Sequence, residues 1–166
     1  MSAGSTWTIN FPTDVDLIEV EVITSDDRFI PEYKTDMAAG VDLMAAIEEP
    51  VTLAPGEVKL IPTGLKMFIN DSLVAGFIFP RSGNGVKKGL VLANTVGVID
   101  ADYQGEIQVA AFNRNHAVYG DTITIEPGDR IAQLVFMPIA YAHFKKVDTF
   151  SEASDRGEGG FGSTGK

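Results

Sequence analysis

The chain has 166 residues and a formal net charge of −10, with 13 Lys and Arg against 23 Asp and Glu. A chain of this length is expected to form one domain with a real core. Its acidity argues against a nucleic-acid partner, because a sequence-independent grip on the phosphate backbone relies on clustered positive charge. It contains no cysteine, which excludes disulfides, thiolate metal sites and a cysteine nucleophile. The sequence shows neither a secretion signal nor an apolar run of membrane-spanning length. We therefore expect a soluble intracellular protein with no membrane partner. Its default location is the cytoplasm, and a nuclear location is left open.

The sequence predicts a small all-β domain with a separate segment at each end of the chain. Residues 1–12 are expected to be a loose leader or an edge strand, 13–150 the β domain, and 151–166 a mobile Gly-rich arm. Within the domain, Ile18, Val20 and Val22 alternate with glutamates, which predicts a first strand. Further strands are expected at Val58 and Leu60, at 65–69 and at 77–79, and a weak helical pattern occurs only at 81–89.

Two Pro-Gly turns punctuate this pattern. They lie at 54–57 and 126–129, where proline pre-sets φ and the following glycine supplies a positive φ. Strand-like sequence follows each of them, so both are expected to be tight connections between strands.

The stretch from Gly97 to Glu106 carries two acids and a tyrosine between glycines. Apolar residues at period two precede it at 90–92 and follow it at 107–111, which predicts two strands flanking an acid-bearing bend. Asp100 could orient or deprotonate a ligand, and Tyr103 could offer an aromatic face to a ring or sugar. A simple turn explains the same residues, because Asp and Gly are ordinary turn residues.

Three more segments have both a functional and a structural interpretation. Asp42 follows small residues and a glycine that let the backbone approach something closely. Arg81 begins a Gly-rich loop with a hydroxyl, whose N–H groups could hold phosphate oxygens. Gln133 could project a donor from a strand toward a ligand. A solvated aspartate, a surface arginine and an exposed glutamine are the alternatives. His116 and His143 stand alone without metal-ligand spacing and are expected to be surface or packing residues.

The C-terminal tail has too few apolar residues to fold by itself. A lone phenylalanine among glycines, with an arginine upstream and two hydroxyls downstream, could form a mobile clamp that stacks on a ring and contacts an anion. A disordered terminus is the alternative. The residues concerned are Arg156, Phe161, Ser163 and Thr164.

Together these segments resemble, in order, the five motifs of the trimeric deoxyuridine triphosphatases. The resemblance spans residues 38–165, and the order and compact spacing of the motifs make chance similarity a poor explanation. The motifs are Ala39-Gly40-Val41-Asp42-Leu43, Pro80-Arg81-Ser82-Gly83, Gly97 to Glu106, Gly128-Asp129-Arg130-Ile131-Ala132-Gln133-Leu134, and Arg156 to Gly165.

The resemblance implies a jelly-roll-like β-barrel or sandwich, assembled as a homotrimer whose three active sites draw motifs from more than one subunit. It implies hydrolysis of dUTP to dUMP and pyrophosphate by water attack on the α-phosphorus, which keeps uracil out of DNA and supplies dUMP for thymidylate synthesis. The C-terminal arm would close over a neighbouring subunit's site. The cofactor would be Mg²⁺, held mostly by the substrate's phosphates, with Asp42 touching it through water.

The resemblance also implies roles for individual residues. Asp100 would hold and activate the attacking water, and Tyr103 would pack under the deoxyribose and exclude a 2′-hydroxyl. Phe161 would stack on the uracil. The uracil edge would be recognised by Asn94 and by the backbone around Gly97, Val98, Ile99 and Gln108. The phosphates would be bound within the domain by Arg81, Ser82, Gly83 and Gln133. The arm would add Arg156, Gly162, Ser163 and Thr164 to the phosphate contacts.

Asn84 and Gly85 depart from the family pattern, because larger apolar residues are commoner after the second motif; this affects the local helix and its packing. Two other functions are weighed. A dCTP deaminase of the same superfamily would be expected to lack the Gly97 to Glu106 pattern and the glycine-rich arm together. A non-catalytic nucleotide sensor or structural trimer would have no reason to keep Asp100, Arg81 and Phe161 together.

Overall fold

The computed structural model describes residues 17–159, and its regular secondary structure over this range is almost entirely β-strand. The all-β class expected from the sequence is confirmed. The strands and the two short helical segments are β1 (Glu21–Thr24), η1 (Asp27–Phe29), β2 (Val41–Met44), β3 (Val51–Leu53), β4 (Val58–Phe68), β5 (Val74–Pro80), η2 (Asn84–Lys88), β6 (Leu90–Leu92), β7 (Gly97–Ile99), β8 (Glu106–Asn113), β9 (Ile123–Ile125) and β10 (Arg130–Pro138).

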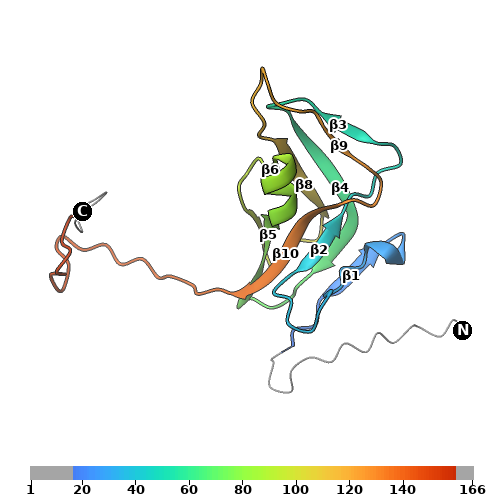
Figure 1. The fold of residues 1–166 in the computed structure, drawn as a ribbon. Coiled ribbons are helices and arrows are strands. Elements are labelled where there is room, and N and C mark those ends of the chain that lie inside the picture. The colour runs from blue at the N-terminus through green and yellow to red at the C-terminus, as the bar shows by residue number, and fades with distance from the viewer. Residues whose placement is uncertain (1–16, 160–166) are drawn as a thin grey trace, which may run out of the picture.

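The strands form two antiparallel sheets and a ribbon (Figure 1). One sheet has the order β1-β4-β8-β6, the other β2-β10-β5-β7, and β3 pairs with β9. From β5 to β8 the chain alternates between the two sheets at every strand. This double-sheet arrangement, in which neighbours in sequence are rarely neighbours in a sheet, is typical of jelly rolls.

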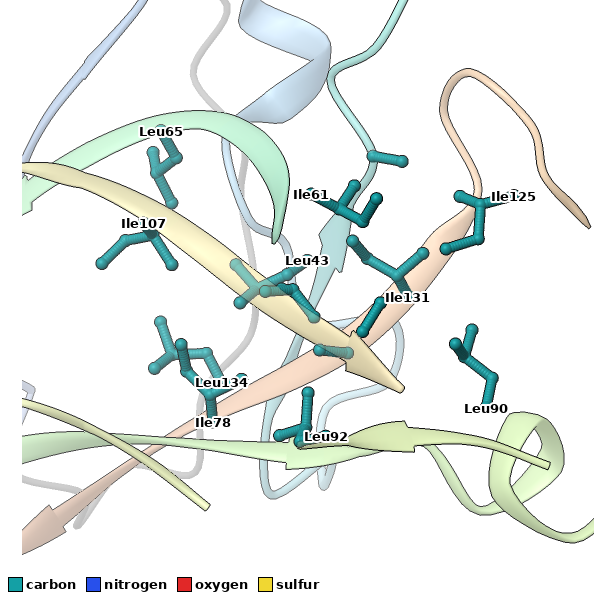
Figure 2. Close-up of a cluster of buried hydrophobic side chains, with 14 of the residues drawn as sticks. Leu43, Ile61, Leu65, Ile78, Leu90, Leu92, Ile107, Ile125, Ile131 and Leu134 are labelled. Carbon is teal, nitrogen blue, oxygen red and sulfur yellow. The ribbon is translucent and has the colours of Figure 1, made fainter. Parts of the chain in front are cut away.

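The core fills the space between the two sheets (Figure 2). In β4 and β8 every second side chain points inward, which buries Ile61, Leu65 and Ile107 from one sheet. Ile78 and Leu134 from the other sheet are buried against them. The period-two apolar pattern therefore correctly predicts which side chains of these strands point into the core. Because a shift by one residue would expose these side chains, the pattern also fixes the register of the strands.

Both Pro-Gly turns form as predicted. Gly56 has φ 82° and Gly128 has φ 80°, and in each turn the residue after the glycine donates its N–H to the carbonyl three residues earlier. In the first turn, Glu57 also accepts a hydrogen bond from the Ala54 N–H at 2.7 Å, and this bond holds the pKa of the Glu57 carboxyl below its ordinary value.

Several expected elements change at their boundaries. The first strand begins at Glu21 instead of near Ile18, and Val22 is 38% exposed. Val58, Leu60 and the segment 65–68 belong to the one long strand β4, in which Val58 and Leu60 are exposed on one face while Leu65 and Met67 are buried on the other. The weak helical pattern at 81–89 is confirmed as a short helical segment at 82–88 that includes η2 and ends at Gly89.

An extended segment leaves the domain after β10 (Figure 1). The Ile139 N–H still donates to Leu73 O, but residues 140–158 are all exposed. They include Tyr141, Phe144 and Phe150, which are 74%, 90% and 90% exposed. Residues 1–16 and the end of the arm lie outside the described part of the chain, and the proposed division into leader, domain and arm stays a prediction. No helix within residues 17–159 is long and apolar enough to cross a membrane.

A buried asparagine ties the β3–β9 ribbon to the main body. Asn113 is fully buried at the end of β8, and its Nδ2 donates to Leu53 O and to Asp121 O, both at 2.9 Å. Its Oδ1 accepts from the Asn115 N–H at 3.0 Å. A buried amide that satisfies three backbone groups is costly to remove, since each group would be left without a partner.

We therefore expect Asn113→Ala to lower the free energy of unfolding by about 3 kcal/mol. Urea unfolding followed by circular dichroism at fixed protein concentration measures the change, with Gln104→Ala, an exposed polar residue, as the control. A loss no larger than that of Gln104→Ala would show that the ribbon does not depend on this amide.

Candidate active site

The acid-bearing bend lies between strands of both sheets. β6 pairs with β8, with Leu92 opposite Ala111, as the flanking apolar pattern predicts. The bend itself is not a simple loop, because Gly97–Ile99 form β7 and pair with β5 of the other sheet. Gly97 permits this pairing, since a Cβ there would lie 3.2 Å from the Cβ of Ile78. The bend is thus fastened to both sheets.

Asp100 opens a β-turn at the end of β7. The Tyr103 N–H donates to Asp100 O at 3.1 Å, so the turn that the residue types predict does form. The side chain of Asp100 is exposed, and within residues 17–159 its carboxylate makes neither a hydrogen bond nor an ion pair. A turn and a reactive carboxylate are therefore compatible here: the backbone closes the turn and leaves both side-chain oxygens available to a ligand or a water.

Tyr103 is held in place after the turn. Its hydroxyl donates to Glu106 O at 3.1 Å, and the hydroxyl end of its ring lies against Gly105, where a Cβ would come within 2.6 Å of the Tyr103 Cζ. Glu106 is anchored in turn, since its Oε1 accepts from the Gly64 N–H at 3.0 Å. The ring stays 43% exposed and presents a fixed aromatic surface beside Asp100.

The same hairpin carries the other residues predicted to recognise a base. Asn94, Val98 and Gln108 are exposed around β7, with Val98 at 59%. Thr95 between them adopts φ 66°, an unusual conformation for a β-branched residue that costs of order 1–3 kcal/mol. Its strain is not predicted from the sequence, because no residue type near it signals a positive φ. Such strain commonly occurs at functional sites, which agrees with the location of Thr95.

A second group of polar residues lies on the other sheet, and we call Asp42, Arg81 and Arg130 the arginine–aspartate cluster. Asp42 Oδ1 lies 2.7 Å from Arg81 Nε, and Asp42 Oδ2 accepts from Arg130 Nη1 at 3.1 Å. The Asp42 side chain is only 15% exposed. The sequence predicts ligand contacts for Asp42 and Arg81, but it does not predict that Arg130 joins them; the Asp-Arg pair at the start of β10 is the only signal.

Strand pairing brings this cluster together. β10 pairs on one side with β2, where Gln133 faces Asp42, and on the other with β5, where Ala132 faces Pro80. Gln133 Nε2 donates to Pro80 O at 2.9 Å, so its amide is used to hold the residue before Arg81. The glycine before β2 is explained by the same packing, because a Cβ on Gly40 would lie 2.8 Å from Leu134 O of β10.

The segment after Arg81, which is the start of the helical segment 82–88 and which the sequence predicts as a loop, is exposed and lies among positive charges. Ser82 and Gly83 are exposed, and a Cβ at Gly83 would meet nothing within 4 Å. A hollow of about 160 Å³ beside it is lined by Arg81, Lys88 and Arg130, with Asp129 as the opposing charge. In a chain of net charge −10 this is a local concentration of cations, and it suits an anionic ligand.

One chain does not bring all the predicted residues into one place. Arg81 follows the last residue of β5, whereas Asp100 follows β7 next to the first residues of β5, since Ile99 faces Gly76. Six strand residues span about 20 Å, so the two side chains lie at opposite ends of β5. Arg156 is exposed on the extended segment, where its Nε donates to Gly159 O at 2.8 Å. Phe161, Gly162, Ser163 and Thr164 lie outside the described residues.

The described residues do not form a metal site of their own. No group of three or more His, Asp or Glu side chains that could hold a metal ion occurs between residues 17 and 159. Asp42 is the one acid in the arginine–aspartate cluster, so a cation there would need ligands from a bound molecule. His116 and His143 are exposed, as expected from their isolation; His116 accepts from the Val118 N–H and stacks on Tyr119.

The fold and the two groups of residues define a class: a jelly-roll-like protein with a cluster of arginines at one end of a sheet and an exposed carboxylate beside a fixed aromatic ring at the other. A family model described as dUTPase matches residues 26–165. The chain therefore belongs to the dUTPase family.

Relatives and solved structures agree with this assignment. The deoxyuridine 5′-triphosphate nucleotidohydrolase of Idiomarina loihiensis is 50% identical over 155 residues, covering 90% of this chain and 99% of its own. The dUTPase of Staphylococcus bacteriophage 80alpha, solved with dUPNHPP, matches with a TM-score of 0.79 and 31% identity over 89% of this chain and 99% of its own. A mutant dUTPase of phage phi11 of S. aureus, whose structure shows a coordinated structural Mg(II) ion, matches with a TM-score of 0.71 and 28% identity over 81% and 99% of the two chains.

The packing of Tyr103 on Gly105 gives a test of the hairpin. Gly105→Ala is expected to push the ring aside, because the new Cβ would overlap it. Discrimination between a deoxyribonucleotide and a ribonucleotide should then fall about tenfold, as judged from the ratio of their kcat/KM values. The control is Gly56→Asn, at a remote turn where a side chain would meet open space. An unchanged ratio would contradict the role of the ring.

Proposed function

We propose that this chain hydrolyses dUTP to dUMP and pyrophosphate. The observation that carries the proposal is the exposed, unpaired Asp100 carboxylate beside the fixed Tyr103 ring, in a chain that belongs to the dUTPase family. The names of its relatives and the dUTP analogue in a structural neighbour support dUTP as the substrate.

The hairpin between β6 and β8 is proposed to hold the nucleoside. Its exposed groups, Asn94, Val98 and Gln108 with the backbone of Gly97 and Ile99, surround β7 and can read the uracil edge. The hydroxyl end of Tyr103 is fixed by its hydrogen bond and by its packing on Gly105, so the ring can pack against the deoxyribose without yielding space to a 2′-hydroxyl. Fixing the ring in advance makes the discrimination effective, since a mobile ring would adapt to either sugar.

The arginine–aspartate cluster and its loop are proposed to hold the phosphates. Arg81 supplies a guanidinium, and phosphate oxygens can approach the exposed residues Ser82 and Gly83, since Gly83 has open space on its side-chain side. Gln133 fixes the start of this loop through Pro80. Arg156 and the arm residues Phe161, Gly162, Ser163 and Thr164 are proposed to close over the bound nucleotide.

Asp100 is proposed as the general base that takes a proton from the water attacking the α-phosphorus. The triphosphate repels an anionic nucleophile, so the reaction depends on neutralising charge and on positioning the water in line with the leaving pyrophosphate. A carboxylate with both oxygens available can orient a water and accept its proton. When bound, Mg²⁺ would be held by the phosphates, with Asp42 contacting it through water, and would neutralise phosphate charge.

The distance between Asp100 and Arg81 leads us to propose a shared site in a homotrimer. Side chains about 20 Å apart at opposite ends of β5 cannot act on one nucleotide within one chain. A cyclic trimer can place the hairpin of one subunit against the arginine–aspartate cluster of another. Exposed apolar side chains offer contact surface for assembly, among them Leu60 at 65% on the outer face of β4 and Phe144 at 90% on the extended segment.

A substrate panel tests the activity. Pyrophosphate release is measured with dUTP, dCTP, dTTP and UTP, with Mg²⁺ and with chelator, and the base is followed by chromatography. Conversion of dUTP alone to dUMP is expected. Asp100→Asn should keep binding of a non-hydrolysable dUTP analogue and reduce turnover about 10³-fold, because the base is lost while the phosphate contacts remain. Deamination of dCTP, binding without turnover, or near-normal turnover by Asp100→Asn would each contradict the proposal.

Mixing two inactive variants tests the shared site. Asp100→Asn and Arg81→Gln should each be inactive alone, whereas co-refolded mixtures at equal amounts should regain about a quarter of wild-type turnover, since a site with both residues then arises at random from two subunits. The matched control mixes the double variant Asp100→Asn/Arg81→Gln with an equal amount of Arg81→Gln, which can never assemble a complete site. Absence of recovery in the first mixture, with a trimer confirmed by light scattering, would place both residues in one subunit's site.

A further inference from the structure

We infer that Arg130 is a positioning residue for phosphate binding, which acts through Asp42 to hold the guanidinium of Arg81. The inference rests on the proposed function for its effect on turnover, but the geometry that it describes belongs to the free chain. It gives a role to the one residue of the arginine–aspartate cluster to which no ligand contact is assigned.

The contacts define a chain of three side chains. Arg130 Nη1 donates to Asp42 Oδ2 at 3.1 Å, and Asp42 Oδ1 lies 2.7 Å from Arg81 Nε. Each carboxylate oxygen therefore faces a different arginine. Asp42 can hold the Arg81 side chain in one orientation only while its own χ2 is fixed, and the bond to Arg130 fixes it.

Burial makes this dependence stronger. The Asp42 side chain is 15% exposed, and that of Arg81 is 28% exposed, so their ion pair is partly shielded from water. Arg130 is 50% exposed and lies on the outer side of the cluster. Removing it would leave Oδ2 without its protein partner and free the carboxylate to turn toward solvent.

The charges of the cluster also suit this role. Two guanidinium groups and one carboxylate leave a net charge of +1 facing an incoming anion. Because the two arginines share one carboxylate, the ion pair that orients Arg81 does not leave the cluster neutral. Without Arg130 the two remaining groups would carry no net charge, so their attraction for an incoming anion would be weaker.

The backbone of Arg130 braces the same loop from the other side. Asn84, in η2 just after Arg81, donates its Nδ2 to Arg130 O at 2.8 Å. Asn84 is one of the two residues at which this chain departs from the family pattern. Because this bond uses the carbonyl of residue 130, replacing its side chain leaves the brace in place and tests the guanidinium alone.

A double-mutant cycle measures the coupling. Arg130→Gln should lower kcat/KM for dUTP about tenfold, mainly through KM, because an interaction with the bound phosphates is lost instead of the base. The same substitution in an Asp42→Asn background should change kcat/KM by less than about twofold, since its partner is already gone. Arg130→Lys should restore part of the loss. Arg28→Gln, which removes another arginine–aspartate ion pair (2.7 Å from Asp26), is the matched control. Equal losses in both backgrounds would overturn the inference, because they would mean that Arg130 contacts the substrate directly.

A second measurement does not depend on turnover. The Nε–H signal of Arg81 in ¹⁵N spectra is identified by its absence in Arg81→Gln. This proton should exchange slowly with water in the wild type and in Arg28→Gln, and should be partly protected in Arg130→Lys. In Arg130→Gln the protection should be lost. Melting temperatures confirm that each variant is folded. Protection that survives in Arg130→Gln overturns the inference. A wild type that fails to hydrolyse dUTP would refute the proposed function instead, and the exchange data would still decide the role of Arg130.

Discussion

The pairing of β10 with both β2 and β5 is the constraint on which the rest of the site depends. It places Asp42 of β2 opposite Gln133 of β10, and Pro80, the residue before Arg81, opposite the neighbouring Ala132. An antiparallel register is set by backbone hydrogen bonds and by the buried face of the sheet, so it is rigid on the scale of a side chain. The arginine–aspartate cluster inherits that rigidity, which a loop alone could not supply.

The same sheet explains why the second group of residues lies elsewhere. β7 pairs with the other edge of β5 and runs antiparallel to it, so Asp100 leaves at the end of β5 opposite Arg81. The hairpin is then fixed locally, by the turn at Asp100 and by the packing of Tyr103 over Gly105. A single chain thus presents two rigid half-sites and an extended segment. In the trimeric arrangement that we propose, this separation lets the hairpin of one subunit meet the arginine–aspartate cluster of another. Each group of residues is already held rigid within its own chain.

Each half-site has a feature that the core lacks. Thr95, with its positive φ, lies on the hairpin, and the backbone at Gly83 faces open space in the charged loop. The core between them is built from ordinary alternating aliphatic side chains, and the buried polar groups Thr63 and Asn113 are both hydrogen-bonded. The well-satisfied core supplies the stability that holds a strained turn and an unfilled charged loop in position.

The sequence by itself determined the all-β class, the Pro-Gly turns, the inward face of strands such as β8, and the family, because period-two patterns and turn residues act locally and motifs are read in order. It also marked Asp42, Arg81 and Asp100 as residues of interest. Only the tertiary structure decided which of them meet. That Asp42 binds two arginines, that Gln133 holds Pro80, and that Asp100 lies far from Arg81 all follow from the order of strands in a sheet. Strand order joins segments up to about ninety residues apart in the chain, and no local pattern in the sequence encodes such a pairing.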